Sequence, residues 1–254
     1  MDKKANLKFI NRDMLKYFAV TVMFVGHFIL YTTPELHLTV RLKPIGTWLV
    51  LFAHMAPPIF FFFIAEGFRY TKSKKKYALR LLGFALAAQF AYVLCHHLHF
   101  DVRVFFTDWN VIMTLFLGLM ALIVWECKLP LPVRLLLIMA FCVASFFTEW
   151  SITGVLIILA LHILRERPYL RLAVYEIIIF AYMIIGLGSL GAVLTRMNLI
   201  TIIMFTVPMI IITFFYNGEK GKNSKFSKYF FYIFYTAHLL IAFIVRVIAV
   251  QLRY

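Results

Sequence analysis

A single histidine, His27, stands inside a long apolar run and is the first candidate for chemistry. The run extends from Leu15 to Phe28, and apart from Lys16 near its start it contains no Asp, Glu, Lys or Arg. A polar group at membrane depth is costly, so those that occur there usually serve a function. A neutral imidazole in such a place can act as a general base near neutral pH. The alternative is a histidine that only hydrogen-bonds a neighbouring helix and packs the bundle.

A second apolar run contains a pair of prolines and several polar side chains. Pro57 and Pro58 cannot donate backbone hydrogen bonds, so the helix is expected to kink or break near them and to bend around a cavity. His54 precedes this break by about one turn. Glu66 and Arg69 are three residues apart on one helix face. They predict either an interfacial ion pair or a polar grip on a ligand.

Positive charge is dense immediately after this run. The cluster consists of Arg69, Lys72, Lys74, Lys75, Lys76 and Arg80. The positive-inside rule accounts for such charge at the cytoplasmic end of a span. The same charge also suits the phosphates of a nucleotide or coenzyme A. The sequence contains no P-loop and no GxGxxG motif, so an ATPase or a Rossmann domain has no support.

Further polar side chains stand within or between the apolar runs. They include Gln89, Asn110, Glu149 and His238. Each can either contact a substrate or hydrogen-bond a neighbouring helix. A group of histidines, His96, His97 and His99 with Asp101, lacks the spacing of a known zinc motif. No metal is therefore expected.

The composition indicates the elements that must position these residues. Of the 254 residues 63% are hydrophobic and 18% are aromatic, and the mean hydropathy is +0.89. A soluble domain would not be so apolar, and continuous rather than alternating apolar runs exclude a barrel. The net charge of +15 lies between the runs, where it serves topology and lipid headgroups, so nucleic acid is not an expected partner.

We therefore expect an all-α, multi-pass protein of the cell membrane, with residues 1–254 forming one domain. The nine apolar runs that predict spans are 14–32, 45–68, 77–97, 110–126, 131–148, 151–165, 171–188, 198–216 and 229–250. The glycine-rich stretch 186–191 is expected to interrupt the seventh run or to add a short re-entrant piece. Lysine and arginine are concentrated in the N-terminal tail, including Lys3 and Lys4, and in alternate loops thereafter. This pattern places the N-terminus in the cytoplasm and, with nine spans, the C-terminus outside.

Several segments together resemble a known family. They are 15–28, 58–71, 76–81, 110–119, 149–156 and 232–239. In this order they look like the TraX family of membrane proteins, which is named for an F-pilin N-acetylation protein and looks related to acyltransferase family 3. Two positions depart from that pattern. Gly26 stands where the family usually has Asp, and His54 where it often has Arg, so another group must orient His27.

The resemblance implies an acyltransferase that uses acetyl-CoA as donor and modifies a hydroxyl or amine of an envelope glycan, lipid or peptide. The residues expected to form the catalytic centre are His27, as base, with Glu66 and Asn110. The residues expected to bind the donor are Arg69, Lys74, Lys75, Lys76 and Arg80, and those expected to bind the acceptor are His54, Gln89, Glu149 and His238. Two alternatives stay open: a transporter or flippase, and a non-catalytic membrane partner.

Overall fold

The computed structural model describes residues 8–36, 43–221 and 225–251, and its regular elements are helices. In chain order they are α1 (Arg12–Leu36), α2 (Lys43–Ala53), α3 (Ala56–Tyr70), α4 (Lys74–His97), α5 (Val102–Thr107), α6 (Val111–Trp125), α7 (Leu131–Ala144), the 3-10 turn η1 (Ser145–Phe147), α8 (Ser151–Ile163), α9 (Pro168–Leu187), α10 (Leu190–Val193), α11 (Arg196–Phe214) and α12 (Lys225–Gln251). The all-α prediction is confirmed. Lys3, Lys4 and the last three residues lie outside the described residues.

Six segments of the described chain are long and apolar enough to cross a membrane. They are Arg12–Thr32, Pro44–Tyr70, Lys74–His97, Pro168–Leu187, Arg196–Phe214 and Phe230–Gln251. The fourth to sixth predicted runs form three shorter apolar helices instead, namely α6, α7 with η1, and α8. The chain is therefore a multi-pass membrane protein. The glycine-rich stretch ends the seventh run and does not interrupt it: α9 is continuous to Leu187, Gly188 adopts a φ of +74°, and the short α10 follows.

The paired prolines divide the second run into α2 and α3. Pro57 and Pro58 have no N–H to donate to the carbonyls of Ala53 and His54, so the α-helical ladder cannot pass through this point. The chain makes a turn at His54 and Met55, and the prolines then occupy the first positions of α3, where a missing N–H costs nothing. The predicted break is confirmed, and it lies just before the prolines.

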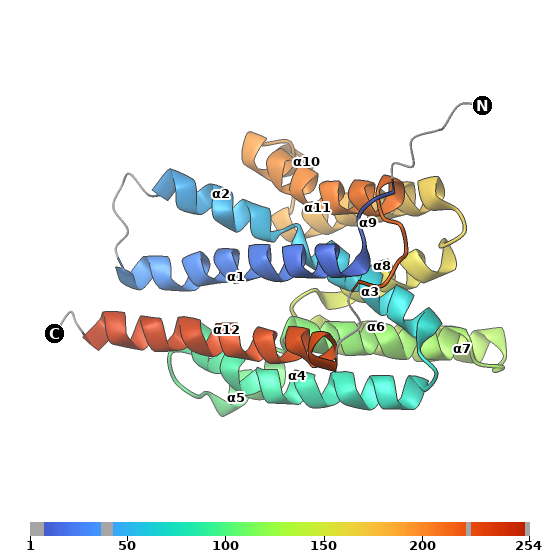
Figure 1. The fold of residues 1–254 in the computed structure, drawn as a ribbon, viewed down its shortest axis with the longest axis horizontal. Helices are drawn as coiled ribbons and strands as arrows, with labels where there is room; N and C mark the ends of the chain where they lie inside the picture. Colours follow the sequence, from blue (N-terminus) through green and yellow to red (C-terminus); the bar gives the residue numbers. More distant parts are fainter. Residues whose placement is uncertain (1–7, 37–42, 222–224, 252–254) are drawn as a thin grey trace.

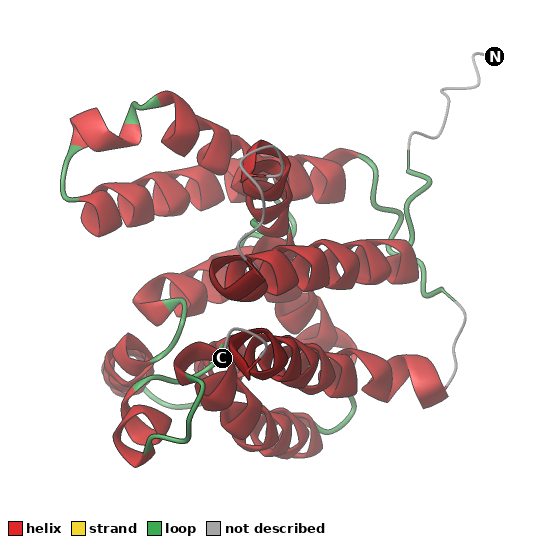
Figure 2. Cartoon of the chain, turned by 90° about the vertical axis from the view of Figure 1, so that its left-hand side faces the viewer, coloured by secondary structure: helices red, strands yellow, loops and turns green. Residues whose placement is uncertain are grey.

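Figure 2 shows the described elements as helices joined by loops, and Figure 1 labels them. Among them, α6 and α8 pack closely on each other and contact α3, α4, α7 and α9. Two glycines permit this approach. A Cβ at Gly118 would overlap Ile158, and a Cβ at Gly154 would overlap Thr114. Because neighbouring helices surround α6 and α8, these helices bury most of their length in protein even though they are short.

One end of the bundle collects the start of α1 and several of the loops (right-hand side of Figure 1); we call it the N-terminal end. There the backbone N–H of Arg12 donates to the carbonyl of Glu219 at 3.0 Å. Glu66 accepts from Arg12 Nε at 2.9 Å and from the hydroxyl of Tyr216 at 2.7 Å. Of the two predicted roles for Glu66 and Arg69, the ion pair between them is not formed, because α1 packs against α3 and brings Arg12 to the carboxylate. Arg69 is exposed, with Glu166 3.9 Å away.

Candidate functional site

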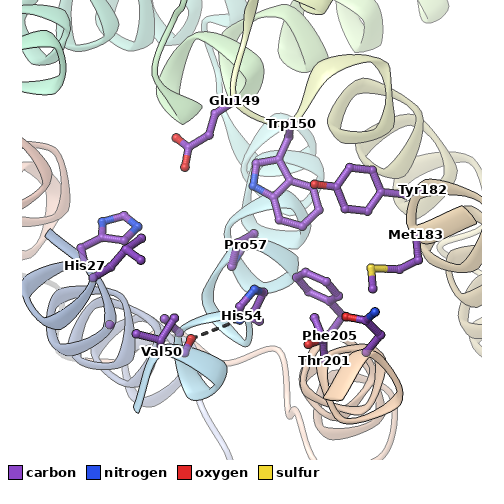
Figure 3. A pocket seen from close by; sticks show the side chains of 14 residues that line it. His27, Val50, His54, Pro57, Glu149, Trp150, Tyr182, Met183, Thr201 and Phe205 are labelled. Atoms are coloured by element: carbon purple, nitrogen blue, oxygen red, sulfur yellow. Dashed lines mark hydrogen bonds between the residues drawn. The ribbon is translucent and has the colours of Figure 1, made fainter. Parts of the chain in front are cut away.

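A cavity of about 460 Å³ lies between α1, α2, α9 and α11 (Figure 3). Its lining residues are Gly26, His27, Leu30, Val50, Ala53, His54, Pro57, Glu149, Trp150, Tyr182, Met183, Asn198, Thr201 and Phe205. Those from α1, α9 and α11 belong to the halves of these helices that lie away from the N-terminal end. The cavity brings together His27, His54 and Glu149, three of the residues predicted from the sequence.

His27 is held by a second histidine from the last helix. Its Nδ1 lies 2.9 Å from Nε2 of His238 on α12, and the two rings are stacked. His238 Nδ1 lies 3.1 Å from the carbonyl of Phe234. A carbonyl can only accept, so this Nδ1 carries the proton, and a neutral His238 then accepts at Nε2 from His27 Nδ1–H. Nε2 of His27 is left as an unprotonated nitrogen that has no hydrogen-bond partner among the described residues.

A backbone carbonyl four residues earlier in the chain also orients two half-buried histidines, His54 and His96. His54 Nδ1 lies 3.1 Å from the carbonyl of Val50. His96 Nδ1 lies 2.9 Å from the carbonyl of Tyr92, and its Nε2 is 2.8 Å from the hydroxyl of Tyr31. The carbonyl belongs to α4 for His96 and to the preceding helix α2 for His54. In the described part of the chain no three His, Cys, Asp or Glu side chains gather as metal ligands do.

Gly26 is required by the packing of α1 on α2. A Cβ at this position would overlap the side chain of Ala53. The bulkier Asp expected from the family pattern would therefore not fit between these two helices as they stand. His238 takes the place of the missing carboxylate as the group that orients His27.

Glu149 reaches the cavity from the turn between η1 and α8. Its backbone N–H donates to the carbonyl of Trp109 at 2.9 Å, and its Oε2 accepts from the N–H of Val111 at 3.0 Å. The side chain is open to the cavity, yet protein encloses it closely enough that burial raises its pKa to about 7. The Val111 hydrogen bond opposes this rise, and the nearby Asp108 adds to it. Glu149 can thus change its protonation state near neutral pH.

Gln89 and Asn110 lie behind the cavity and do not line it. Both side chains are 0% exposed. Asn110 caps α6 by accepting from the N–H of Ile112 at 3.0 Å, and its Nδ2 donates to Ala85 O and to Gln89 Oε1. Gln89 in turn donates to the carbonyl of Asp108 at 2.6 Å. The two residues hold α4 against the start of α6 and so fix the turn that carries Glu149.

Two small voids extend from the N-terminal end toward the site. The first, of about 110 Å³, is lined by Lys16, Phe60, Phe63, Ile64, Tyr77, Leu81, Leu115, Phe231 and Tyr232. The second, of about 60 Å³, is lined by Met23, Phe60, Val111, Ile112, Leu115, Phe231, Tyr232 and Tyr235. They share four lining residues and form what we call the aromatic slot. It begins at Lys16 and ends at Val111, the residue whose N–H binds Glu149.

The predicted donor-binding cations lie around the mouth of this slot or outside it. Lys74 Nζ lies 3.9 Å from the ring centroid of Phe68, and Arg80 stacks over Tyr77 at 5.3 Å. Arg69, Lys75 and Lys76 are exposed at the surface.

Lys16 was not among the residues predicted to bind the acyl donor. It lines the slot and lies between the rings of Phe63 and Phe231, at 5.2 and 5.1 Å. A lysine at the start of an apolar run was the only sequence signal for it.

The comparisons with known proteins agree with the sequence resemblance. The family described as "TraX protein" matches residues 11–246. The chain is similar to a protein of Dichelobacter nodosus described as "Probable fimbrial assembly protein FimC, serogroup H1". The two are 27% identical in an alignment of length 185 that covers 69% of this chain and 75% of that protein. No solved structure matches the chain.

Proposed function

Because the chain belongs to the TraX family, we propose that it is a membrane-embedded acyltransferase. In this proposal an acyl group, acetyl in the simplest case, moves from acyl-CoA to a hydroxyl or amine of an envelope glycan, lipid or peptide. The observation that carries the proposal is the His27–His238 pair, which presents an unprotonated nitrogen at the wall of a cavity. An oriented imidazole of this kind is suited to take a proton from an attacking hydroxyl or amine.

The acceptor side of the reaction is assigned to the cavity. His27, His54 and Glu149 offer polar groups among aromatic walls, with Trp150 stacked on Tyr182. Such a mixture suits a substrate that presents one nucleophile on a larger apolar or amphipathic body. The similar Dichelobacter protein is described as a probable fimbrial assembly protein, which favours a pilus subunit among the possible acceptors.

The donor side is assigned to the aromatic slot. In this proposal the narrow thioester arm of the donor enters the slot. The charged nucleotide part of coenzyme A does not enter it. Its phosphates would remain outside, near Lys16, Lys74 and Arg80. Gln89 and Asn110 take no part in contacting substrate and act by positioning Glu149.

In this proposal the N-terminal end faces the cytoplasm, which holds acyl-CoA. The basic stretch Lys72–Lys76 and the loop carrying Arg165 and Arg167 then lie on the cytoplasmic side. The three shorter helices α6, α7 and α8 bring the number of crossings in this proposal to nine. α6 and α8 are shorter than a full span, and the neighbouring helices cover them. The cavity, built from the other halves of the helices, faces the envelope.

One observation favours a second candidate, a transporter or flippase. The break between α2 and α3 at His54 and Met55 resembles the discontinuous helices that form transporter binding sites. This function predicts movement of a substrate with no covalent change and no use of acyl-CoA. A non-catalytic membrane partner predicts neither movement nor reaction.

The test is acyl transfer by the purified protein in detergent. Acetyl-CoA is the donor, glycinamide and glycerol are minimal amine and hydroxyl acceptors, and released CoA and acetylated product are measured by mass spectrometry. We expect wild-type protein to release CoA, and His27→Ala to lose at least about 100-fold in rate while it still folds, as shown by a cooperative melting transition. His97→Ala is the matched control, because His97 is exposed on the adjoining end of α4. Wild-type protein with no release above a heat-denatured sample would overturn acyl transfer, and an active His27→Ala would remove His27 as base.

A further inference from the structure

Tyr235 carries a buried hydroxyl that the fold itself does not use. Its side chain is 4% exposed. The hydroxyl proton has no acceptor among the residues that the structure describes. Other buried tyrosines are satisfied: the hydroxyl of Tyr175 donates to the carbonyl of Phe205 at 2.9 Å, and that of Tyr216 to Glu66 at 2.7 Å. A buried hydroxyl without an acceptor costs folding free energy, so its presence calls for a function.

Tyr235 contacts both the aromatic slot, which is assigned to the donor, and His238, which orients His27. It lines the inner void of the aromatic slot together with Val111 and Met23. It also precedes His238 by three residues on α12, and the two rings make an edge-to-face contact at 5.2 Å. The N–H of Val111 lies near the Tyr235 hydroxyl oxygen and donates to Glu149 Oε2. Because the Val111 N–H cannot accept a hydrogen bond, the hydroxyl proton of Tyr235 remains free to be donated to another group.

We propose that the Tyr235 hydroxyl donates a hydrogen bond to the thioester carbonyl oxygen of the acyl donor when the donor's arm fills the slot. This inference rests on the proposed acyl transfer. A fixed donor at this oxygen stabilises the negative charge that develops there in the transition state. Tyr235 is thereby a catalytic residue, because it touches the reacting group.

The step balances as follows. The lone pair of the acceptor oxygen or nitrogen forms a bond to the carbonyl carbon while its proton moves to His27 Nε2. The π pair of the carbonyl moves to oxygen, which Tyr235 stabilises without giving up its own proton. The carbonyl then re-forms, the carbon–sulfur bond breaks, and the sulfur leaves with the bonding pair and takes the proton from His27. The products are the acylated acceptor and free CoA.

Tyr235→Phe removes the hydroxyl and keeps the ring. With acetyl-CoA and glycinamide as probes, we expect kcat to fall roughly 100-fold with little change in the KM for acetyl-CoA, since the hydrogen bond acts on charge that develops in the transition state. The melting temperature should stay the same or rise, because no native hydrogen bond is lost. Tyr175→Phe is the matched control. It loses the buried hydrogen bond to the carbonyl of Phe205, and Tyr175 itself lines neither the cavity nor the slot, so its melting temperature should fall while its kcat is kept.

The outcomes separate the inference from the proposed function. Wild-type protein that releases no CoA overturns both. Active wild-type protein with an equally active Tyr235→Phe overturns the inference alone. A Tyr235→Phe variant that loses activity through a raised KM at unchanged kcat also overturns it, since that result assigns the hydroxyl to ground-state binding.

Discussion

Glu149→Gln tests whether the cavity holds a carboxyl that titrates near neutral pH. Burial raises the pKa of Glu149 from its usual value near 4.5 to about 7. Between these values the folded protein keeps a proton that the unfolded chain releases. Its contribution therefore makes the free energy of unfolding fall as pH rises from about 4.5 to about 7. Glutamine stays neutral at every pH, and its amide oxygen can still accept from Val111 N–H.

The size of the effect follows from the two pKa values. Each pKa unit corresponds to about 1.36 kcal/mol, which gives an upper limit of about 3 kcal/mol above pH 7. The side chain is open to the cavity, where water screens the carboxylate, so we expect about 1–2 kcal/mol. For a chain of this length that corresponds to a melting temperature about 2–8 °C higher in Glu149→Gln at pH 8.

The assay is thermal unfolding of both proteins in the same detergent between pH 5 and pH 8. At pH 5 the two melting temperatures should be close, and above pH 7 the variant should be the more stable. All other titratable groups are the same in both proteins, so their contributions cancel in the difference. Glu166→Gln is the control, because Glu166 is exposed and its replacement should leave the pH slope of the wild type. A Glu149→Gln curve parallel to the wild type across this range would refute a titrating carboxyl in the cavity.

Two further predictions concern the packing of α1 and the mouth of the slot. Gly26→Ala should lower the free energy of unfolding by about 1–3 kcal/mol, because its Cβ overlaps Ala53. The double variant Gly26→Ala with Ala53→Gly should recover most of that loss, and a double variant as unstable as the sum of the singles would contradict this contact. Lys16→Met should raise the KM for acetyl-CoA more than it lowers kcat, because phosphate contacts are made in the ground state as well. Lys75→Met, which changes an exposed cation outside the slot, should leave the KM unchanged, and equal KM values for the two variants would count against donor binding at Lys16.

The sequence alone determined the membrane class, the positions of the long apolar helices, the break in the second apolar run and the end of the seventh. These properties depend on neighbouring residues only. Hydrophobic runs must be covered by lipid or protein, prolines at 57 and 58 remove two backbone donors, and Gly188 accepts a positive φ. Local chemistry of this kind is the same whatever the rest of the chain does. The bounds of α6, of α7 with η1, and of α8 also agree with the predicted runs to within two residues. Their local sequence does not decide whether they cross a membrane, because they are shorter than a full span.

Only the tertiary structure decided which polar groups meet. His27 and His238 are 211 residues apart and are joined because α12 packs on α1. Glu66 pairs with Arg12, 54 residues away, rather than with Arg69 on its own helix. Asn110 and Gln89, which looked like site residues, satisfy each other behind the cavity instead. Such pairings leave no spacing signal in the sequence, because they depend on which helix faces come into contact once the bundle is assembled.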